Sequence, residues 1–216
     1  MTIDRFQRQA DLVPRSRIDA VNATVIGVGA VGRQIALQLA SIGIRNLQLI
    51  DFDQVELTNV TTQGYRPDQI GQFKVEATAA DVKAMDPEIE VDVIADRYRP
   101  LFKTGDAGFA CVDSIKARAA IWRSLQAQCS LWIDGRMRGE VIRVLASDDP
   151  AGDSNYSKSL FDPSEADTGS CTSASTVYAA NLTASLMVHQ FTRWLRKIPV
   201  ERDVSVNLLA SEMASH

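Results

Sequence analysis

The sequence predicts an α/β fold with three layers: a mostly parallel sheet, helices on both of its faces, and antiparallel strands towards the C-terminus. First, a short apolar strand leads into a glycine-rich turn and a helix, and a second strand then ends on an acidic residue. Second, further apolar strands alternate with helical patterns, which is typical of parallel sheets. Third, two strands near the C-terminus lie close enough together to form a hairpin.

The glycine-rich turn lies within residues 24–53, which read as strand, turn, helix, strand and acid. Its G-x-G-x-x-G pattern consists of Gly27, Gly29 and Gly32. Such glycines allow a tight bend, close approach of the backbone to phosphate, and close packing of helix on strand. Backbone N–H groups at the start of the helix then face an anion. In this context the pattern is the dinucleotide-binding fingerprint, so we expect a Rossmann-like nucleotide site.

Polar residues follow the second strand. Asp51 ends that strand, where its carboxylate can accept hydrogen bonds from ribose hydroxyls. Residues 52–65 are polar and are interpreted as a loop. Because ligands bind at the carboxyl ends of strands in open α/β sheets, Asp53, Asn59 and Gln63 are candidate site residues. A solvated loop is the alternative, since Asp and Asn are common in turns.

Two charged residues are expected at the same edge of the sheet. Lys74 lies at the start of a helix expected over 71–85, from which it can point back towards the phosphate turn. A surface lysine would look the same in sequence. Asp113 ends a strand over 107–112, a suitable place to hold a metal ion bound to phosphate. Alternatively, Asp113 caps the helix that follows.

The rest of the chain completes the predicted fold. Further helices are expected at 115–128 and 173–195, and further strands at 89–95, 131–134, 137–146 and 204–209. The strands on either side of Gly135 are expected to join at that glycine. Residues 147–169 are rich in Asp, Ser, Gly and Pro, which predicts a long loop that serves as a substrate or crossover loop. We expect a single domain over residues 1–216, with an arginine-rich arm at 1–22.

Composition narrows the function classes. A net charge of −4 gives no reason to propose nucleic acid or an anionic membrane as the main partner. No apolar stretch approaches the roughly 20 residues that span a bilayer, and the polar N-terminus is unlike a signal peptide. The three cysteines form no C-x-x-C pair, so a reducing cytoplasm is the simplest setting. Only two histidines are present, which argues against a Cys/His zinc site.

Four further segments are more specific than the glycines: RFQRQ at 5–9, the LIDFD stretch that runs through Asn59 at 49–59, IGQFKVEA at 70–77, and CVDSIKAR at 111–118. In this order and spacing they resemble the ThiF/MoeB/HesA family, the adenylating relatives of ubiquitin-activating enzymes. The resemblance covers residues 5–146 well, and the final helix follows in the expected place.

The resemblance implies ATP rather than NAD, and adenylation of a carboxylate with release of pyrophosphate. Asp51 would hold the ribose, Asn59 and Lys74 would contact the phosphates, and Asp113 would bind a magnesium ion. Arg8 resembles the arginine that reaches into the neighbouring subunit's nucleotide site, which implies a homodimer. The implied substrate is the C-terminal glycine of a small ubiquitin-like or sulfur-carrier protein, or a peptide.

The sequence departs from the family pattern in three places. Thr62 stands where a phosphate-contacting arginine is usual, and Arg17 and Arg66 are candidate substitutes. The C-x-x-C pairs that bind structural zinc in many relatives are absent. Cys171, followed by a threonine, loosely resembles the catalytic cysteine of ubiquitin-activating enzymes and could accept an acyl group as a thioester. Many relatives work without such a cysteine.

Two alternative functions stay open. A nicotinamide-dependent oxidoreductase would explain the glycine turn and Asp51, but it leaves Asn59, Lys74 and Asp113 without roles. A catalytically weak relative that binds nucleotide as a scaffold or regulatory subunit is the other alternative, and Thr62 keeps it open.

Overall fold

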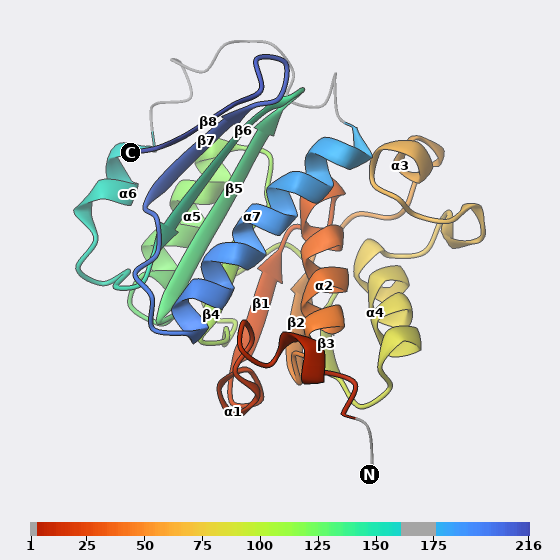
Figure 1. Ribbon diagram of the computed structural model, residues 1–216. Helices are drawn as coiled ribbons and strands as arrows, with labels where there is room; N and C mark the ends of the chain where they lie inside the picture. The colour runs from red at the N-terminus through yellow and green to blue at the C-terminus, as the bar shows by residue number, and fades with distance from the viewer. Residues whose placement is uncertain (1–3, 161–175) are drawn as a thin grey trace.

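The computed structural model describes residues 4–160 and 176–216, and an eight-stranded sheet forms its centre (Figure 1). The strand order is β3-β2-β1-β4-β5-β6-β7-β8. The strands are β1 (Asn22–Ile26), β2 (Asn46–Ile50), β3 (Glu90–Ile94), β4 (Ala107–Ala110), β5 (Leu131–Arg138), β6 (Val141–Ser147), β7 (Asp203–Asn207) and β8 (Glu212–Ser215). Strands β1 to β5 are parallel, and β6, β7 and β8 are antiparallel. The predicted mixed sheet is therefore confirmed.

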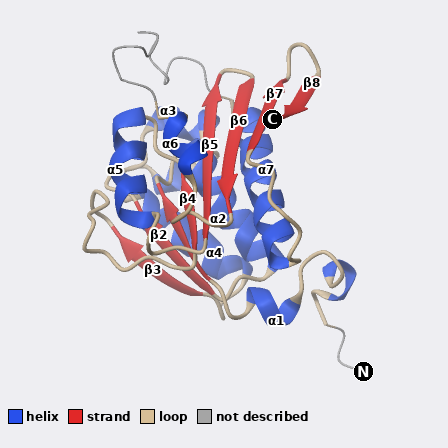
Figure 2. Ribbon diagram, turned by 90° about the vertical axis from the view of Figure 1, so that its left-hand side faces the viewer, coloured by secondary structure: helices blue, strands red, loops and turns tan. Residues whose placement is uncertain are grey.

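Helices cover both faces of the sheet, with α2, α4 and α7 on one face and α5 and α6 on the other (Figures 1 and 2). The helical segments are η1 (Gln7–Gln9), α1 (Arg15–Ile18), α2 (Ala30–Ile42), α3 (Leu57–Thr62), η2 (Pro67–Gln69), α4 (Lys74–Met85), α5 (Ile115–Leu125), α6 (Ser154–Lys158) and α7 (Val177–Leu195). The three predicted layers are present. In the described part of the chain, no helix is long and apolar enough to cross a membrane.

The central strands are apolar on both sides because both of their faces are covered. In β1, Val25 packs into the core beneath α2 and α7, whereas Ile26 packs towards α5. In β2, Leu49 likewise packs into the core beneath α2 and α7, and Ile50 packs towards α5. This burial on alternate faces explains why the strands read as continuous apolar runs.

The N-terminal arm docks on the end of α2 that lies farthest from the glycine turn. Helix α2 ends at Gly43, whose φ of 95° is left-handed and whose N–H donates to the carbonyl of Leu39 at 3.1 Å. The Gly43 carbonyl accepts a hydrogen bond from Arg15 Nη1 at 2.9 Å. A Cβ at Gly43 would lie only 2.7 Å from the ring of Phe6, so the arm packs directly against this glycine.

A row of polar side chains crosses the sheet between β1, β2 and β3. Thr24 Oγ1 donates to Gln48 Oε1 at 3.0 Å, and Gln48 Nε2 donates to Asp92 Oδ2 at 2.7 Å. These residues are aligned in register on adjacent strands. No described helix lies between β3 and β4, and the row borders a cavity of about 560 Å³ at the edge where the parallel strands begin.

The structure corrects the prediction at Gly135. We expected two strands joined at this glycine, but β5 runs through it and pairs Gly135 with Val144. The hairpin turn comes later, at Gly139, whose φ is 59°. A Cβ at Gly135 would overlap Sδ of Met187 and lie 3.2 Å from Thr183 Cγ2. The glycine is therefore needed for the close approach of α7 to the sheet, not for a turn.

Other boundaries also differ from the prediction. The loop expected at 52–65 contains α3, and the loop expected from 147 contains α6. The last expected strand is followed by a further edge strand, β8, which is exposed along its length. Short helices and edge strands bury few apolar side chains, so their hydrophobic period is too weak to predict them.

We predict that Gly135→Ala lowers the free energy of unfolding by about 1–3 kcal/mol, because the added methyl group forces Met187 and Thr183 out of their packed positions. Chemical denaturation followed by circular dichroism measures this change. Gly139→Asn is the matched control, since this position is open and asparagine tolerates a positive φ. Equal stability of the two variants would contradict this interpretation of Gly135.

Candidate nucleotide site

Packing explains two of the three glycines in the turn. Gly27 has a φ of 86°, and a Cβ there would lie 2.7 Å from the carbonyl oxygen of Cys111. A Cβ at Gly32 would overlap the carbonyl oxygen of Gly27. By contrast, a Cβ at Gly29 would meet only Gln63 Oε1, at 3.9 Å. Packing among the described residues therefore leaves space at position 29, which would allow a ligand to approach the backbone.

The peptide groups of Val28 are held from both sides. Its N–H donates to Asp51 Oδ2 at 2.5 Å, and its carbonyl oxygen accepts a hydrogen bond from the Tyr65 hydroxyl at 2.6 Å. The second oxygen of Asp51 accepts from the N–H of Asp53 at 2.8 Å. Both oxygens of Asp51 thus have protein donors, and the strand-end carboxylate is fixed beside the turn.

Burial raises the pKa of Asp51, although two backbone N–H donors and the nearby ammonium of Lys74 act in the opposite direction. Each carboxylate oxygen can accept more than one hydrogen bond. The Asp51 side chain can therefore keep its protein donors and still accept bonds from the hydroxyls of a ribose.

Lys74 is the first residue of α4, and its ammonium pairs with Asp53. Its Nζ lies 3.2 Å from Asp53 Oδ2. The Lys74 side chain is 9% exposed, whereas that of Asp53 is 47% exposed. The pair thus places a mostly buried cation next to the accessible carboxylate of Asp53, at the edge that carries the glycine turn.

Asn59 lies on α3, the helix that the sequence did not predict, and Gln63 is the residue that follows it. Asn59 Oδ1 accepts a hydrogen bond from the N–H of Glu56 at 2.9 Å and so caps the helix. Gln63 Oε1 is buried and has no hydrogen-bond partner among the described residues. An unpartnered buried acceptor is costly, and this one lies beside the open approach to Gly29. Gln63 therefore adjoins the turn, whereas the contacts of Asn59 lie within its own helix.

Asp113 follows β4 at the same edge and is exposed. It makes no hydrogen bond with any described residue. The alternative role of helix cap belongs to Ser114, whose Oγ accepts from the N–H of Ala117 at 3.1 Å. The carboxylate of Asp113 is thus left accessible at the edge of the sheet.

The structure separates Arg8 from these residues. Arg8 is exposed on η1, and the adjacent Gln9 donates from Nε2 to the carbonyl of Ile42 at 2.8 Å. Ile42 ends α2, whose 13 residues separate it from the glycine turn by about 20 Å. Arg8 therefore cannot reach the turn of its own chain.

The candidate substitutes for the missing arginine also lie elsewhere. The guanidinium of Arg17 packs 5.9 Å from the ring of Trp194 near the end of α7. Arg66 is paired with Asp68 and Asp81. Thr62 itself donates its hydroxyl to the carbonyl of Thr58 at 2.8 Å. In the described structure, none of the three supplies a free donor to the turn.

The sequence did not predict the roles of Tyr65 and Arg33. Tyr65 binds the backbone of the turn, and Arg33 packs against Tyr65. The Tyr65 hydroxyl contacts Thr78 Oγ1 at 3.2 Å as well as Val28. The guanidinium of Arg33 lies 4.4 Å from the Tyr65 ring and pairs with Asp81 at 2.8 Å. A tyrosine at the end of a polar stretch carries no sequence signal for this role.

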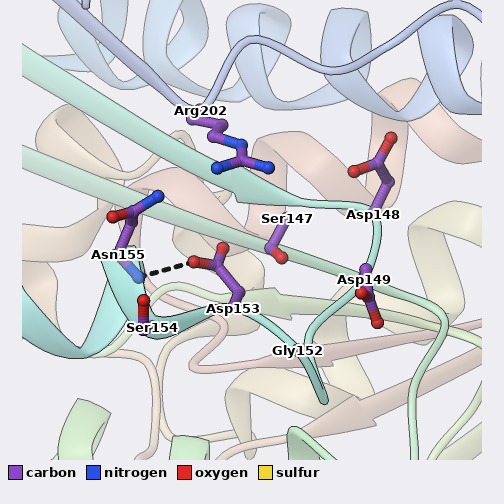
Figure 3. A pocket seen from close by; sticks show the side chains of 8 residues that line it. All are labelled: Ser147, Asp148, Asp149, Gly152, Asp153, Ser154, Asn155 and Arg202. Atoms are coloured by element: carbon purple, nitrogen blue, oxygen red, sulfur yellow. Dashed lines mark hydrogen bonds between the residues drawn. The ribbon is translucent and has the colours of Figure 1, made fainter.

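Two further predictions concern the region after β6. Cys171 lies outside the described residues, as does part of the expected 147–169 loop. Its described part lines a polar pocket of about 110 Å³ together with Arg202 (Figure 3). Asp153 caps α6 there and accepts a hydrogen bond from the N–H of Asn155 at 2.7 Å. Ser147 pairs with Trp132 near the start of β5, so this pocket lies at the edge opposite the glycine turn.

The residues at the turn fit ATP and magnesium. The first N–H groups of α2 have no side-chain cap, and Gly29 leaves room for phosphate in front of them. Magnesium in nucleotide sites is commonly held by one or two carboxylates together with phosphate oxygens. Asp113 supplies one accessible carboxylate. No group of three or more Cys, His, Asp or Glu residues in the described ranges could hold a metal without a ligand's help.

The chain is similar in sequence to known proteins. The family model described as "ThiF family" matches residues 5–213. Ubiquitin-like modifier-activating enzyme 5 of Aedes aegypti is 33% identical over 133 residues, which are 54% of this chain and 34% of the relative. The Caenorhabditis elegans enzyme of the same name is 29% identical over 145 residues, 60% of this chain and 35% of the relative. The chain spans about a third of the length of these curated relatives.

Solved structures share the fold. Selenomethionine PaaA superposes with a TM-score of 0.80 at 20% identity, over 98% of this chain and 72% of that chain. E. coli MccB with ATP gives a TM-score of 0.76 at 18% identity, over 100% of this chain and 72% of that one. MccB has also been solved with MccA, and that structure gives the same TM-score of 0.76.

We predict that Gly29→Ala changes ATP affinity, whereas Gly32→Ala changes stability. Gly29→Ala leaves the thermal unfolding midpoint nearly unchanged but weakens ATP binding at least about tenfold, which corresponds to about 1.4 kcal/mol of lost backbone–phosphate hydrogen bonds. Gly32→Ala forces α2 away from Gly27 and lowers the midpoint. Calorimetric titration and thermal melting measure the two quantities. Unchanged ATP affinity in Gly29→Ala would place the phosphates elsewhere.

Proposed function

Because the chain belongs to the ThiF family, we propose that it is an adenylyltransferase that uses ATP to activate a carboxylate. The observation that supports the proposal is a turn left open at Gly29, with Asp51 bound to the N–H of Val28 and Lys74 paired with Asp53 beside it. We propose that Asn59 and Asp113 complete this site. Asp51, Asn59, Lys74 and Asp113 come from four different parts of the chain. A ribose, a triphosphate and a metal each find a matching group among them.

The proposed reaction needs no protein nucleophile. The substrate carboxylate attacks the α-phosphorus of ATP, the bond from this phosphorus to the bridging oxygen breaks, and pyrophosphate leaves. Negative charge grows on the phosphate oxygens as the reaction proceeds. The ammonium of Lys74 and the N–H groups at the start of α2 stabilise this charge. Magnesium, bound through Asp113, neutralises further phosphate charge when present.

The names of the relatives support a protein or peptide substrate. Two curated relatives are ubiquitin-like modifier-activating enzymes, and MccB has been solved with MccA. We therefore propose the C-terminal glycine of a small ubiquitin-like or sulfur-carrier protein, or a peptide, as the group that is activated. We expect the acyl group to pass to sulfur, to an amine or to Cys171, and the protein to act in the cytoplasm.

A nucleotide-binding scaffold is the second candidate, and the environment of Thr62 favours it. The hydroxyl of Thr62 is already donated within α3, and Arg17 and Arg66 have partners away from the turn. A site with one cation fewer would bind ATP and yet react slowly. An oxidoreductase is less well supported, because hydride transfer gives Lys74 and Asp113 no role.

The position of Arg8 supports a homodimer. Its side chain is exposed at the far end of α2 and cannot reach the turn of its own chain. A second copy could present this arginine to the phosphates and supply the charge that Thr62 lacks. On this proposal each site is complete only in the dimer.

We predict ATP–pyrophosphate exchange that depends on a carrier ending in Gly-Gly or on a peptide. Lys74→Ala and Asp113→Ala lower the exchange rate about 10²-fold or more, because each removes a group that stabilises phosphate charge. Lys83→Ala is the matched control, since Lys83 lies near the other end of α4, where its Nζ donates to the carbonyl of Pro87 at 3.4 Å. Tight ATP binding without exchange for any carrier would favour the scaffold.

We also predict that two inactive variants complement each other. Arg8→Ala and Lys74→Ala are each nearly inactive, but mixed dimers contain one site with both residues. An equal mixture should regain about a quarter of the wild-type exchange rate if subunits pair at random. The exchange assay before and after mixing tests this. A mixture no more active than its components would argue against a shared site.

A further inference from the structure

Asp113 is positioned by the backbone on either side of it, because its exposed side chain makes no hydrogen bond with a described residue. Ser114 fixes the C-terminal side as the cap of α5. On the other side, the guanidinium of Arg118 donates to the carbonyl oxygen of Val112. This carbonyl belongs to the peptide that leads into Asp113, so Arg118 sets the orientation of that peptide.

Arg118 is held in turn by a buried carboxylate. It pairs with Asp134 of β5, whose side chain is fully buried, and donates to the Gly135 carbonyl at 3.1 Å. Asp134 accepts two more hydrogen bonds at Oδ2: from Arg136 Nε at 2.7 Å and from the Tyr156 hydroxyl at 3.0 Å. Asp134 is thus the centre of a polar network in the core.

Tyr156 brings the short helix α6 into this network. Its side chain is buried, with its ring 4.5 Å from that of Trp122 and 5.7 Å from that of Trp132. Arg136 also donates to the carbonyl and to the hydroxyl of Ser159, each at 2.9 Å. Helix α6 is therefore connected through side chains to the backbone in front of Asp113.

The network contains more positive than negative charge. Burial, followed by repulsion from Arg136, lowers the pKa of Arg118 to about 10, which still leaves it protonated at neutral pH. Burial also lowers the pKa of Arg136. Asp134 lies between both guanidiniums, so any loss of its alignment leaves buried charge unpaired. The carboxylate of Asp113 is among the nearby groups that interact with Arg118.

We propose that Tyr156 is a positioning residue for Asp113. It acts through Asp134 and Arg118, which transmit the position of α6 to the Val112–Asp113 peptide. The inference rests on the proposed function, in which Asp113 binds magnesium together with the phosphates of ATP. Outer-sphere residues that orient a metal ligand commonly change metal affinity without contacting the metal.

The test measures how much magnesium tightens the binding of a non-hydrolysable ATP analogue, as the ratio of Kd values without and with Mg²⁺ by calorimetric titration. Asp113→Asn should abolish the tightening. Arg118→Lys should reduce it about tenfold and Tyr156→Phe about threefold, while the metal-free Kd stays unchanged. Tyr156→Phe keeps the buried ring, and thermal melting verifies its fold. It therefore decides the question if Arg118→Lys does not fold.

Tyr98→Phe is the matched control. The Tyr98 hydroxyl donates to Ser124 Oγ on α5 at 2.9 Å, a bond without a link to Asp134, so this variant should keep the wild-type ratio. If Asp113→Asn abolishes the tightening but Tyr156→Phe and Arg118→Lys both keep the wild-type Kd ratio, the inference about Tyr156 is overturned. The proposed function is not affected by that result. Equal weakening with and without Mg²⁺ would also overturn the inference about Tyr156. If Asp113→Asn keeps the tightening, the proposed metal role of Asp113 is wrong and the inference is overturned with it.

Discussion

The contact between the start of α2 and the end of β1 is the constraint on which the rest of the site depends. No Cβ fits at Gly32 because the carbonyl of Gly27 occupies its place. The helix therefore begins directly on the strand, with its first N–H groups at the carboxyl edge of the sheet. Asp51 and Tyr65 then fix the intervening Val28 from opposite sides. On the proposed function, a phosphate would meet a turn that is already held in place by these contacts, so little ordering would accompany binding.

Much of this arrangement could be predicted from local sequence, because parallel strands place their carboxyl ends at one edge. Gly27, Asp51 and Asp113 each follow an apolar run, and the structure brings all three to the same edge. Asn59 was also a candidate, although the helix that carries it was not predicted. Helix α3 is six residues long, too short for a clear apolar period.

The interactions that could not be predicted join residues far apart in the chain. Gly135 looked like a turn residue because its role depends on Met187 of α7, which no local pattern reveals. The same holds for Asp134, whose acidic side chain in an apolar strand makes sense only once Arg118 and Tyr156 are in place. A buried charge is tolerated only with its partners, and the fold supplies those partners.

The polar row of Thr24, Gln48 and Asp92 has a consequence for folding. In parallel strands made of Val, Ile and Leu, a shift by two residues keeps an apolar side chain at each buried position. Burial of apolar side chains alone therefore favours the correct alignment only weakly over a shifted one. Hydrogen bonds across the three strands, at 3.0 Å and 2.7 Å, form only in the native alignment. A slipped sheet would leave the buried hydroxyl of Thr24 without Gln48 as its acceptor. The row therefore favours one alignment of the three strands, and this alignment determines where each strand ends at the carboxyl edge of the sheet.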